Sequence, residues 1–142
     1  MREFTKAAWP TIEPGVEFKN NWHIDAISDH LQSVAEGTGI KRLIINVPPR
    51  HMKSISVAVA LPAWTWASQP HKKFLYASYA SSLSIRDSVK CRRLIDSPWY
   101  KAHFGDKFKL TDDQNQKQRF ENDHTGYRIA TSVGGALTGD GG

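Results

Sequence analysis

The chain has 142 residues, of which 39% are hydrophobic and 23% are charged, and its formal net charge is +5. This length and composition fit one globular domain with a single core, and they exclude a fibrous or disordered chain. Because Cys91 is the only cysteine, no disulfide framework and no cysteine-based metal centre can form within the chain. No apolar run approaches the ~20 residues of a membrane span, and residues 1–4 do not begin a secretion signal, so we expect an intracellular protein.

The first third of the chain is expected to hold an irregular segment, a helix and a strand. Prolines and a glycine predict an irregular lead-in over residues 1–22. A helix should follow, because apolar residues recur at helical spacing over residues 24–34. One of two adjacent asparagines can cap its start, and Gly37 can end it. Residues 43–47 are apolar and rich in β-branched side chains, which predicts a strand buried on both faces of a parallel sheet.

Helices and strands alternate through the rest of the chain. The elements expected there are a helix over 53–67, a strand over 74–79, a helix over 82–95, a short helical turn over 99–104, a loop over 111–117, and a hairpin formed by 118–122 and 127–132. Strand, helix, strand, helix is the order of an α/β fold, in which helices flank a parallel sheet.

The most informative segment joins the first expected strand to the second expected helix. It reads Val47-Pro48-Pro49-Arg50-His51-Met52-Lys53-Ser54. A loop in this position can bind phosphate, because the start of a helix presents free N–H groups and the positive end of its dipole. A lysine and a serine at the helix start have specific uses there. Lys53 can reach the β- and γ-phosphates of ATP, and the Ser54 hydroxyl can ligate Mg²⁺.

The segment departs from the general phosphate-loop pattern, G-x-x-x-x-G-K-[ST], at both of its glycine positions. Val47 and Met52 stand where the glycines belong. Without glycine, a tight loop requires a backbone conformation that other residues rarely adopt. From the pattern and its context, a proline-terminated strand followed by a charged helix start is therefore an equal alternative to an ATP site.

Residues 48–54, following the strand 43–47, resemble the deviant Walker A motif of the large terminase subunits that package DNA into tailed-phage heads. In that family the glycine-free form recurs. Four further segments are similar to the family in the same order along the chain: Trp22-His23-Ile24, Tyr76–Leu83, Ser97–Tyr100 and Ile129–Gly139. The resemblance implies a P-loop NTPase-type α/β fold with a parallel sheet. Residues 1–22 would be the lead-in, and residues 23–142 the first part of the ATPase domain.

The resemblance also implies the roles of individual residues. Lys53 would neutralise the β/γ-phosphates, Ser54 would hold Mg²⁺, and Arg50 would sense the γ-phosphate or stabilise the transition state. The remaining nucleotide-binding residues implied are Pro49, His51 and Met52 in the loop, with Trp22 and His23 near the adenine. For Trp22 the alternative is that it packs the helix start against the core.

In the family, the segment ending at Gly139 runs into a Walker B strand with a pair of acids. No apolar stretch here ends in such a pair, so the resemblance implies a chain that stops before Walker B, with an incomplete sheet and without the nuclease domain. We therefore expect weak nucleotide binding without turnover. Central strands would be missing, so we also expect a bare apolar sheet edge and a chain that aggregates or is partly molten.

For the intact protein, the resemblance implies an ATPase that drives double-stranded DNA into the prohead. It would work as a homo-oligomeric ring with the portal protein and the small terminase subunit, in the cytoplasm of a bacterial host and without contact to membrane. Two alternatives stay open: a different P-loop enzyme such as a helicase-like ATPase, and a non-enzymatic basic module that binds nucleic acid. Arg86, Lys90 and Arg93 share a helical face that would meet DNA or a neighbouring subunit, or would simply be solvated.

Overall fold

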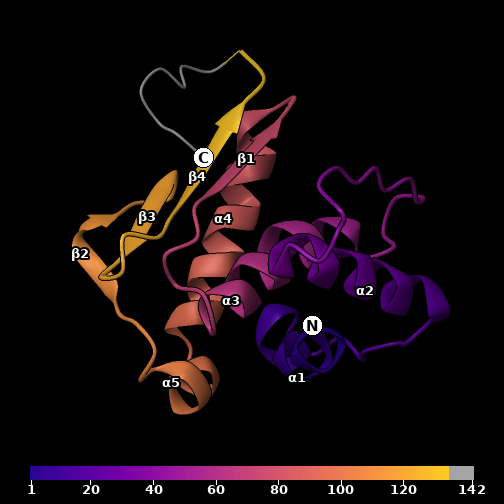
Figure 1. Ribbon diagram of the computed structural model, residues 1–142, viewed down its shortest axis with the longest axis horizontal. Helices are drawn as coiled ribbons and strands as arrows, with labels where there is room; N and C mark the ends of the chain where they lie inside the picture. Colours follow the sequence, from indigo (N-terminus) through magenta and orange to yellow (C-terminus); the bar gives the residue numbers. More distant parts are fainter. Residues whose placement is uncertain (135–142) are drawn as a thin grey trace.

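The computed structural model describes residues 1–134 and places an α/β arrangement around one mixed sheet (Figure 1). The elements are, in order, α1 (Arg2–Ile12), α2 (Trp22–Glu36), the π-helix η1 (Ile55–Ala60), α3 (Leu61–Trp66), β1 (Phe74–Ser78), α4 (Ser81–Asp96), α5 (Pro98–Phe104), β2 (Leu110–Asn115), β3 (Arg119–Asn122) and β4 (Tyr127–Ser132). The strand order is β1-β4-β3-β2. Only β1 and β4 are parallel, so the prediction of an α/β fold is confirmed, whereas the prediction of a parallel sheet holds for one strand pair.

Several predicted elements are confirmed with small shifts at their ends. In α2, Asn21 caps the start by accepting a hydrogen bond from the Trp22 amide, and Gly37 ends the helix in the left-handed conformation at φ 71°. The strand at β1, the helices α4 and α5, and the hairpin of β3 and β4 also lie where the pattern predicts them. The polar residues 111–117, however, are not a loop, because most of them form the edge strand β2 with exposed polar side chains.

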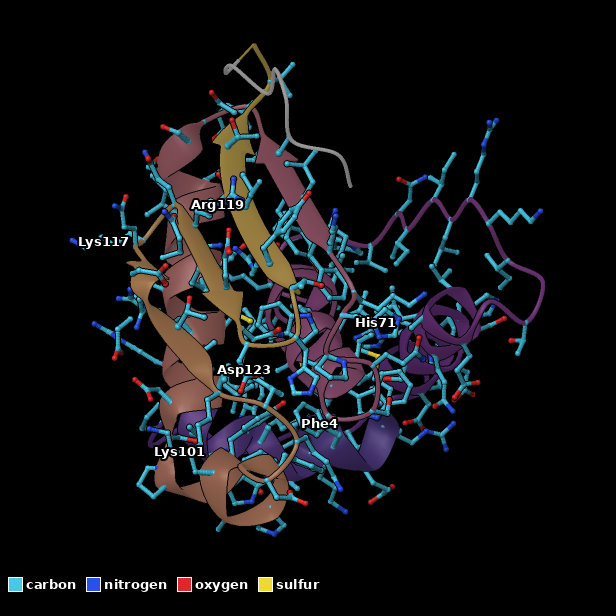
Figure 2. The ribbon with its side chains drawn as sticks, turned by 60° about the vertical axis from the view of Figure 1, so that its left-hand side comes forward. Phe4, His71, Lys101, Lys117, Arg119 and Asp123 are labelled. Atoms are coloured by element: carbon cyan, nitrogen blue, oxygen red, sulfur yellow. The ribbon has the colours of Figure 1, made fainter. Side chains whose placement is uncertain are left out.

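Residues 2–12 form a helix, so the prediction of an irregular lead-in over residues 1–22 is wrong for its first half. Phe4, Ala8 and Ile12 recur at helical spacing and are all buried. Pro10 lies in the last turn, where it removes only one intrahelical hydrogen bond. The Phe4 ring packs against Trp99, Tyr100 and Phe104 at centroid distances of 5.7, 6.3 and 5.8 Å, which fixes α1 against the C-terminal half of the chain (Figure 2).

The segment 43–47 is extended, but the prediction that it forms a buried strand of a sheet is wrong for the described chain. No described strand pairs with it, so its backbone has no ladder partner. Leu43, Ile45 and Val47 turn one face toward the core, while Ile44 is 86% exposed. Figures 1 and 2 both show this stretch standing apart from the sheet.

The helix after residue 52 begins at Lys53 and continues through η1 and α3 to Trp66, as predicted. Pro62 lies inside it and has no amide hydrogen. An amide at this position would donate to the Ala58 carbonyl in an α-helix or to the Val57 carbonyl in a π-helix, and neither bond can form. Two side chains from the sheet replace that donor. The Tyr76 hydroxyl donates to the Val57 carbonyl at 2.7 Å, and Arg128 Nη2 donates to the Ala58 carbonyl at 2.9 Å.

The core lies between this helix, α4 and the sheet. Trp66 is fully buried, and its ring contacts Phe74, Phe108 and Phe120 at centroid distances of 6.3, 5.5 and 5.7 Å. Helix α4 packs along β1 and β4 and also against η1 (Figure 1). This packing brings the second turn of α4 beside the start of the helix that follows the loop 48–52.

Candidate functional site

The loop before the helix has the backbone geometry that the sequence pattern requires. Arg50 and Met52 adopt left-handed φ angles of 65° and 62°, although neither is glycine. Each such residue costs on the order of 1 kcal/mol and persists only where the surroundings hold it in place. Met52 occupies the second glycine position of the phosphate-loop pattern, so the fold keeps the turn that a glycine would make.

The His51 imidazole helps to fix this turn. Its Nδ1 lies 2.9 Å from the carbonyl oxygen of Pro49, and its ring centroid lies 5.4 Å from that of His23 on α2. The His51 side chain is thus hydrogen-bonded to the backbone of its own loop. The structure therefore brings His23 beside the loop.

The helix start is open to a ligand. Lys53 and Ser54 are exposed, and no side chain caps the helix beginning there. The first amides of a helix have no intrahelical acceptor, so their N–H groups are available to an anion. Within residues 1–134, no hydrogen bond or ion pair joins the Lys53 ammonium or the Arg50 guanidinium to another residue.

A cavity of about 520 Å³, which we call the loop cavity, surrounds these groups. Its charged lining consists of Arg50, Lys53 and Arg86, with no carboxylate among the lining residues. Arg86 is paired with Asp87, whose side chain does not line this cavity, so three cationic side chains border one space that no carboxylate enters. Such a lining favours a multiply charged anion such as a polyphosphate.

A second cavity, the outer cavity of about 710 Å³, adjoins the loop cavity on the side of α2. Trp9, Arg50, His51 and Met52 line both spaces, and His23 lines the outer one. Trp9 is held there by its indole Nε1–H, which donates to the Val16 carbonyl at 2.7 Å. A ring from a ligand would meet imidazole and indole surfaces in this cavity.

Trp22 does not share this arrangement. Its side chain is 78% exposed and lines neither cavity, so the alternative that it packs the helix start against the core is wrong. Among the aromatic rings of residues 1–134, the Trp22 ring lies beside that of His23 alone, with centroids 6.2 Å apart and planes almost perpendicular.

A third space, the inner groove of about 360 Å³, lies between the extended segment 43–47 and β1. Leu43 and Ile45 line one side of it, and Tyr76 and Ala77 line the other. Arg128 forms part of its lining and is fully buried, with its guanidinium 4.4 Å from the Tyr76 ring centroid. Its Nε and Nη1 have no hydrogen-bond partner. Burial raises the pKa of the Tyr76 hydroxyl well above its usual range.

The pattern of the sequence missed three residues of this region. Trp9 was missed because Pro10 and Pro14 outweighed the helical spacing of its neighbours. Arg86 was grouped with a basic helical face. Arg128 was placed in a strand, but the sequence did not indicate which face of that strand is buried. The similar segment Ile129–Gly139 continues past residue 134, so its last part lies outside the described residues.

The residues present fit Mg²⁺ as a partner of bound phosphate. Among the described residues, no group of three or more His, Cys, Asp or Glu side chains is placed to hold a metal ion. Mg²⁺ bound to nucleotide phosphates needs only one or two protein ligands, however, and the exposed Ser54 hydroxyl at the helix start meets that requirement.

No family model, no curated protein and no solved structure matches the chain. Within the described part of the chain, no helix is both long enough and apolar enough to cross a membrane.

Proposed function

We propose that this chain binds a nucleoside triphosphate with Mg²⁺ at the loop 48–54, as the first part of a P-loop ATPase domain of the DNA-packaging terminase type. The observation that carries the proposal is the loop cavity. Its left-handed Met52 stands at the glycine position, the helix start behind it is uncapped, and three cations line it without a carboxylate.

In this proposal each charged or polar residue of the loop has a role. The Lys53 ammonium neutralises the β- and γ-phosphates, and the amides at the helix start donate to phosphate oxygens. Arg50 projects from the loop, where its guanidinium stabilises charge that develops on the γ-phosphate during hydrolysis. Mg²⁺, when bound, would supply positive charge to the phosphates, and the Ser54 hydroxyl is the group of this chain that would hold it. The base lies in the outer cavity, against His23 and Trp9.

The inner groove supports the P-loop type of sheet. The extended segment 43–47 has no described strand beside it, and the facing edge of β1 is also unpaired. In the proposal, further strands of the intact domain lie between these two, so that segment 43–47 becomes a central strand and the helix start faces the sheet's carboxyl edge.

In the intact protein, we propose that hydrolysis drives double-stranded DNA into a phage prohead. The partners would be further copies of the chain in a ring, a portal protein and a small terminase subunit, in the cytoplasm of a bacterial host. The nuclease activity would belong to a separate domain. A helicase-like ATPase would use the same loop, whereas a purely basic nucleic-acid module would need a free basic face. Lys90 pairs with Glu13, and Arg92 donates to the Asn115 carbonyl at 2.8 Å, so that face is partly engaged within the chain.

Titration calorimetry with ATP and Mg²⁺ tests the proposal. We expect saturable binding to the chain and at least a tenfold weaker affinity after Lys53→Ala, since the lost contact is charge-assisted. Lys6→Ala is the matched control, because Lys6 is an exposed lysine on α1 with no described partner, and it should leave the affinity unchanged. Equal affinity of the wild type and Lys53→Ala would remove the phosphate-loop assignment.

A further inference from the structure

Arg86 is the residue of α4 that reaches the phosphate loop. It lies in the second turn of the helix, which packs against η1. Of the described residues, Lys53, Ser54 and Arg86 alone line both the loop cavity and the inner groove. Arg86 therefore stands at the same wall as the lysine and serine of the loop, although it comes from a different part of the chain.

The Arg86 guanidinium is held in place by its neighbour Asp87. Arg86 Nε donates to Asp87 Oδ1 at 2.9 Å, and Nη2 lies 2.8 Å from the same oxygen. The Asp87 side chain is 12% exposed, whereas that of Arg86 is 54% exposed. A nearly buried carboxylate thus anchors one edge of the guanidinium, and Nη1 keeps no partner among the described residues.

The other basic residues of α4 do not share this position. Lys90 is paired with Glu13, and Arg92 is hydrogen-bonded to the Asn115 backbone. Arg93 is exposed in the last turn of the helix and lines none of the three cavities. Arg86 is therefore set apart from a continuous basic face of the kind that a nucleic-acid backbone would require.

The overlap of the cavities gives the direction in which a nucleotide would lie. The outer cavity shares residues with the loop cavity, the loop cavity shares residues with the inner groove, and the outer cavity shares none with the groove. A nucleotide with its base beside His23 in the outer cavity runs through the loop cavity toward the wall of Lys53, Ser54 and Arg86. The end that reaches Arg86 is the terminal phosphate.

We propose that Arg86 binds the terminal phosphate of the triphosphate and makes the site prefer a triphosphate to a diphosphate, with Asp87 as its positioning residue. This assignment rests on the proposed nucleotide site. The exposed Nη1 edge donates to an oxygen of the third phosphate, which a diphosphate lacks. Removing Arg86 therefore weakens the triphosphate selectively, whereas removing Lys53 weakens both ligands.

The test is calorimetric titration of the chain with ATP and with ADP, each with Mg²⁺. The variants are Arg86→Ala, Arg86→Lys and Asp87→Asn, with Arg93→Ala as a control on the same helix. For Arg86→Ala we expect a loss of about tenfold or more in ATP affinity and a change of less than about twofold for ADP. Arg86→Lys keeps the charge but not the bidentate anchor, so it recovers part of the preference. Asp87→Asn weakens the hold on the guanidinium and lowers the ratio of ATP to ADP affinity by a smaller factor.

Equal losses for ATP and ADP in Arg86→Ala, or no loss for either, would overturn the assignment of Arg86 while Lys53→Ala still weakens both ligands. Absence of binding to the wild type would overturn the nucleotide site itself, and Arg86 with it. Far-ultraviolet circular dichroism of each variant shows whether the chain keeps its helix content. Should Arg86→Ala unfold the chain, the same ATP-to-ADP ratio measured on Arg86→Lys and Asp87→Asn decides the question.

Discussion

The hydrogen bond from Arg128 to the Ala58 carbonyl leads to a quantitative prediction about stability. Pro62 has no amide hydrogen, so the Ala58 carbonyl takes its donor from Arg128 Nη2 at 2.9 Å. In Arg128→Met that carbonyl loses the Arg128 donor, which costs about 1–3 kcal/mol. In a Pro62→Ala background the new alanine amide can donate to the carbonyl four residues earlier. We therefore expect Arg128→Met to cost about 1–2 kcal/mol less in that background.

The measurement is a double-mutant cycle on the free energy of unfolding, from urea denaturation followed by circular dichroism. The loss of the contact with Tyr76, and of the unpaired Nε and Nη1, occurs in both backgrounds and cancels in the cycle. Pro10→Ala is the matched control, because Pro10 also lies inside a helix but its missing donor faces the Lys6 carbonyl. Additive effects of Arg128→Met and Pro62→Ala would refute the view that Arg128 substitutes for the proline's absent donor.

Three further predictions concern the loop, the buried acids and the sheet edge. Met52→Gly should change the free energy of unfolding by less than about 1 kcal/mol and keep the affinity for ATP. Met52→Val places a β-branched side chain at φ 62°, so it should lower the free energy of unfolding by about 1–2 kcal/mol and weaken ATP binding. Equal behaviour of the two variants in urea denaturation and calorimetry would contradict the strained turn. Burial raises the pKa of Cys91 to about 11 from 9.0 and raises the pKa of Tyr76 and Tyr100 well above 10.0. The unfolded chain therefore loses these protons at lower pH than the folded chain does. The free energy of unfolding should fall as pH rises above about 9, and these groups should give it no pH dependence below about pH 8; a flat profile to pH 11 would be inconsistent with their burial. Leu75, 42% exposed on the edge strand β1, and Ile44, 86% exposed, should make the 142-residue chain associate, so Leu75→Lys or Ile44→Lys should reduce the aggregate measured by light scattering. A wild type that stays monomeric as its concentration is raised would argue against the bare edge.

Helices with a clear apolar period were predictable from the sequence, because their burial follows local spacing. The pattern in α2 and the Gly37 end required no knowledge of the rest of the fold. The helix α1 was missed although Phe4, Ala8 and Ile12 carry the same signal. Proline was read as a breaker there, whereas near the end of a helix it costs little.

The sheet was harder to predict, because strands depend on partners that lie elsewhere in the chain. Residues 43–47 have the composition of a central strand, yet no described strand pairs with them. Residues 110–115 have the composition of a loop, yet they pair with β3 as an edge strand whose polar side chains face outward. Strand propensity reflects how well a residue packs on a half-buried sheet surface. A prediction based on it therefore fails where a segment has no neighbouring strand or where a strand is exposed to solvent.

The candidate site divides in the same way. Residues close together in sequence, from Pro49 to Ser54, were identified from their order and from the position of the helix start. Trp9, Arg86 and Arg128 reach the region only through the packing of α1, α4 and β4, which no local pattern encodes. The left-handed Met52 was predictable in part. The sequence showed that the position was unusual, and the backbone angle of 62° gives the reason.

The most direct test of the proposal that the loop 48–54 binds phosphate is a titration of the isotope-labelled chain with ATP and Mg²⁺, followed by amide proton and nitrogen chemical shifts. We predict saturable shifts centred on the amides of residues 50–54, a smaller set at His23, and no comparable response to adenosine, which lacks phosphates. Shifts spread along the exposed basic residues without saturation, or an identical response to adenosine, would contradict a phosphate-binding loop at this helix start.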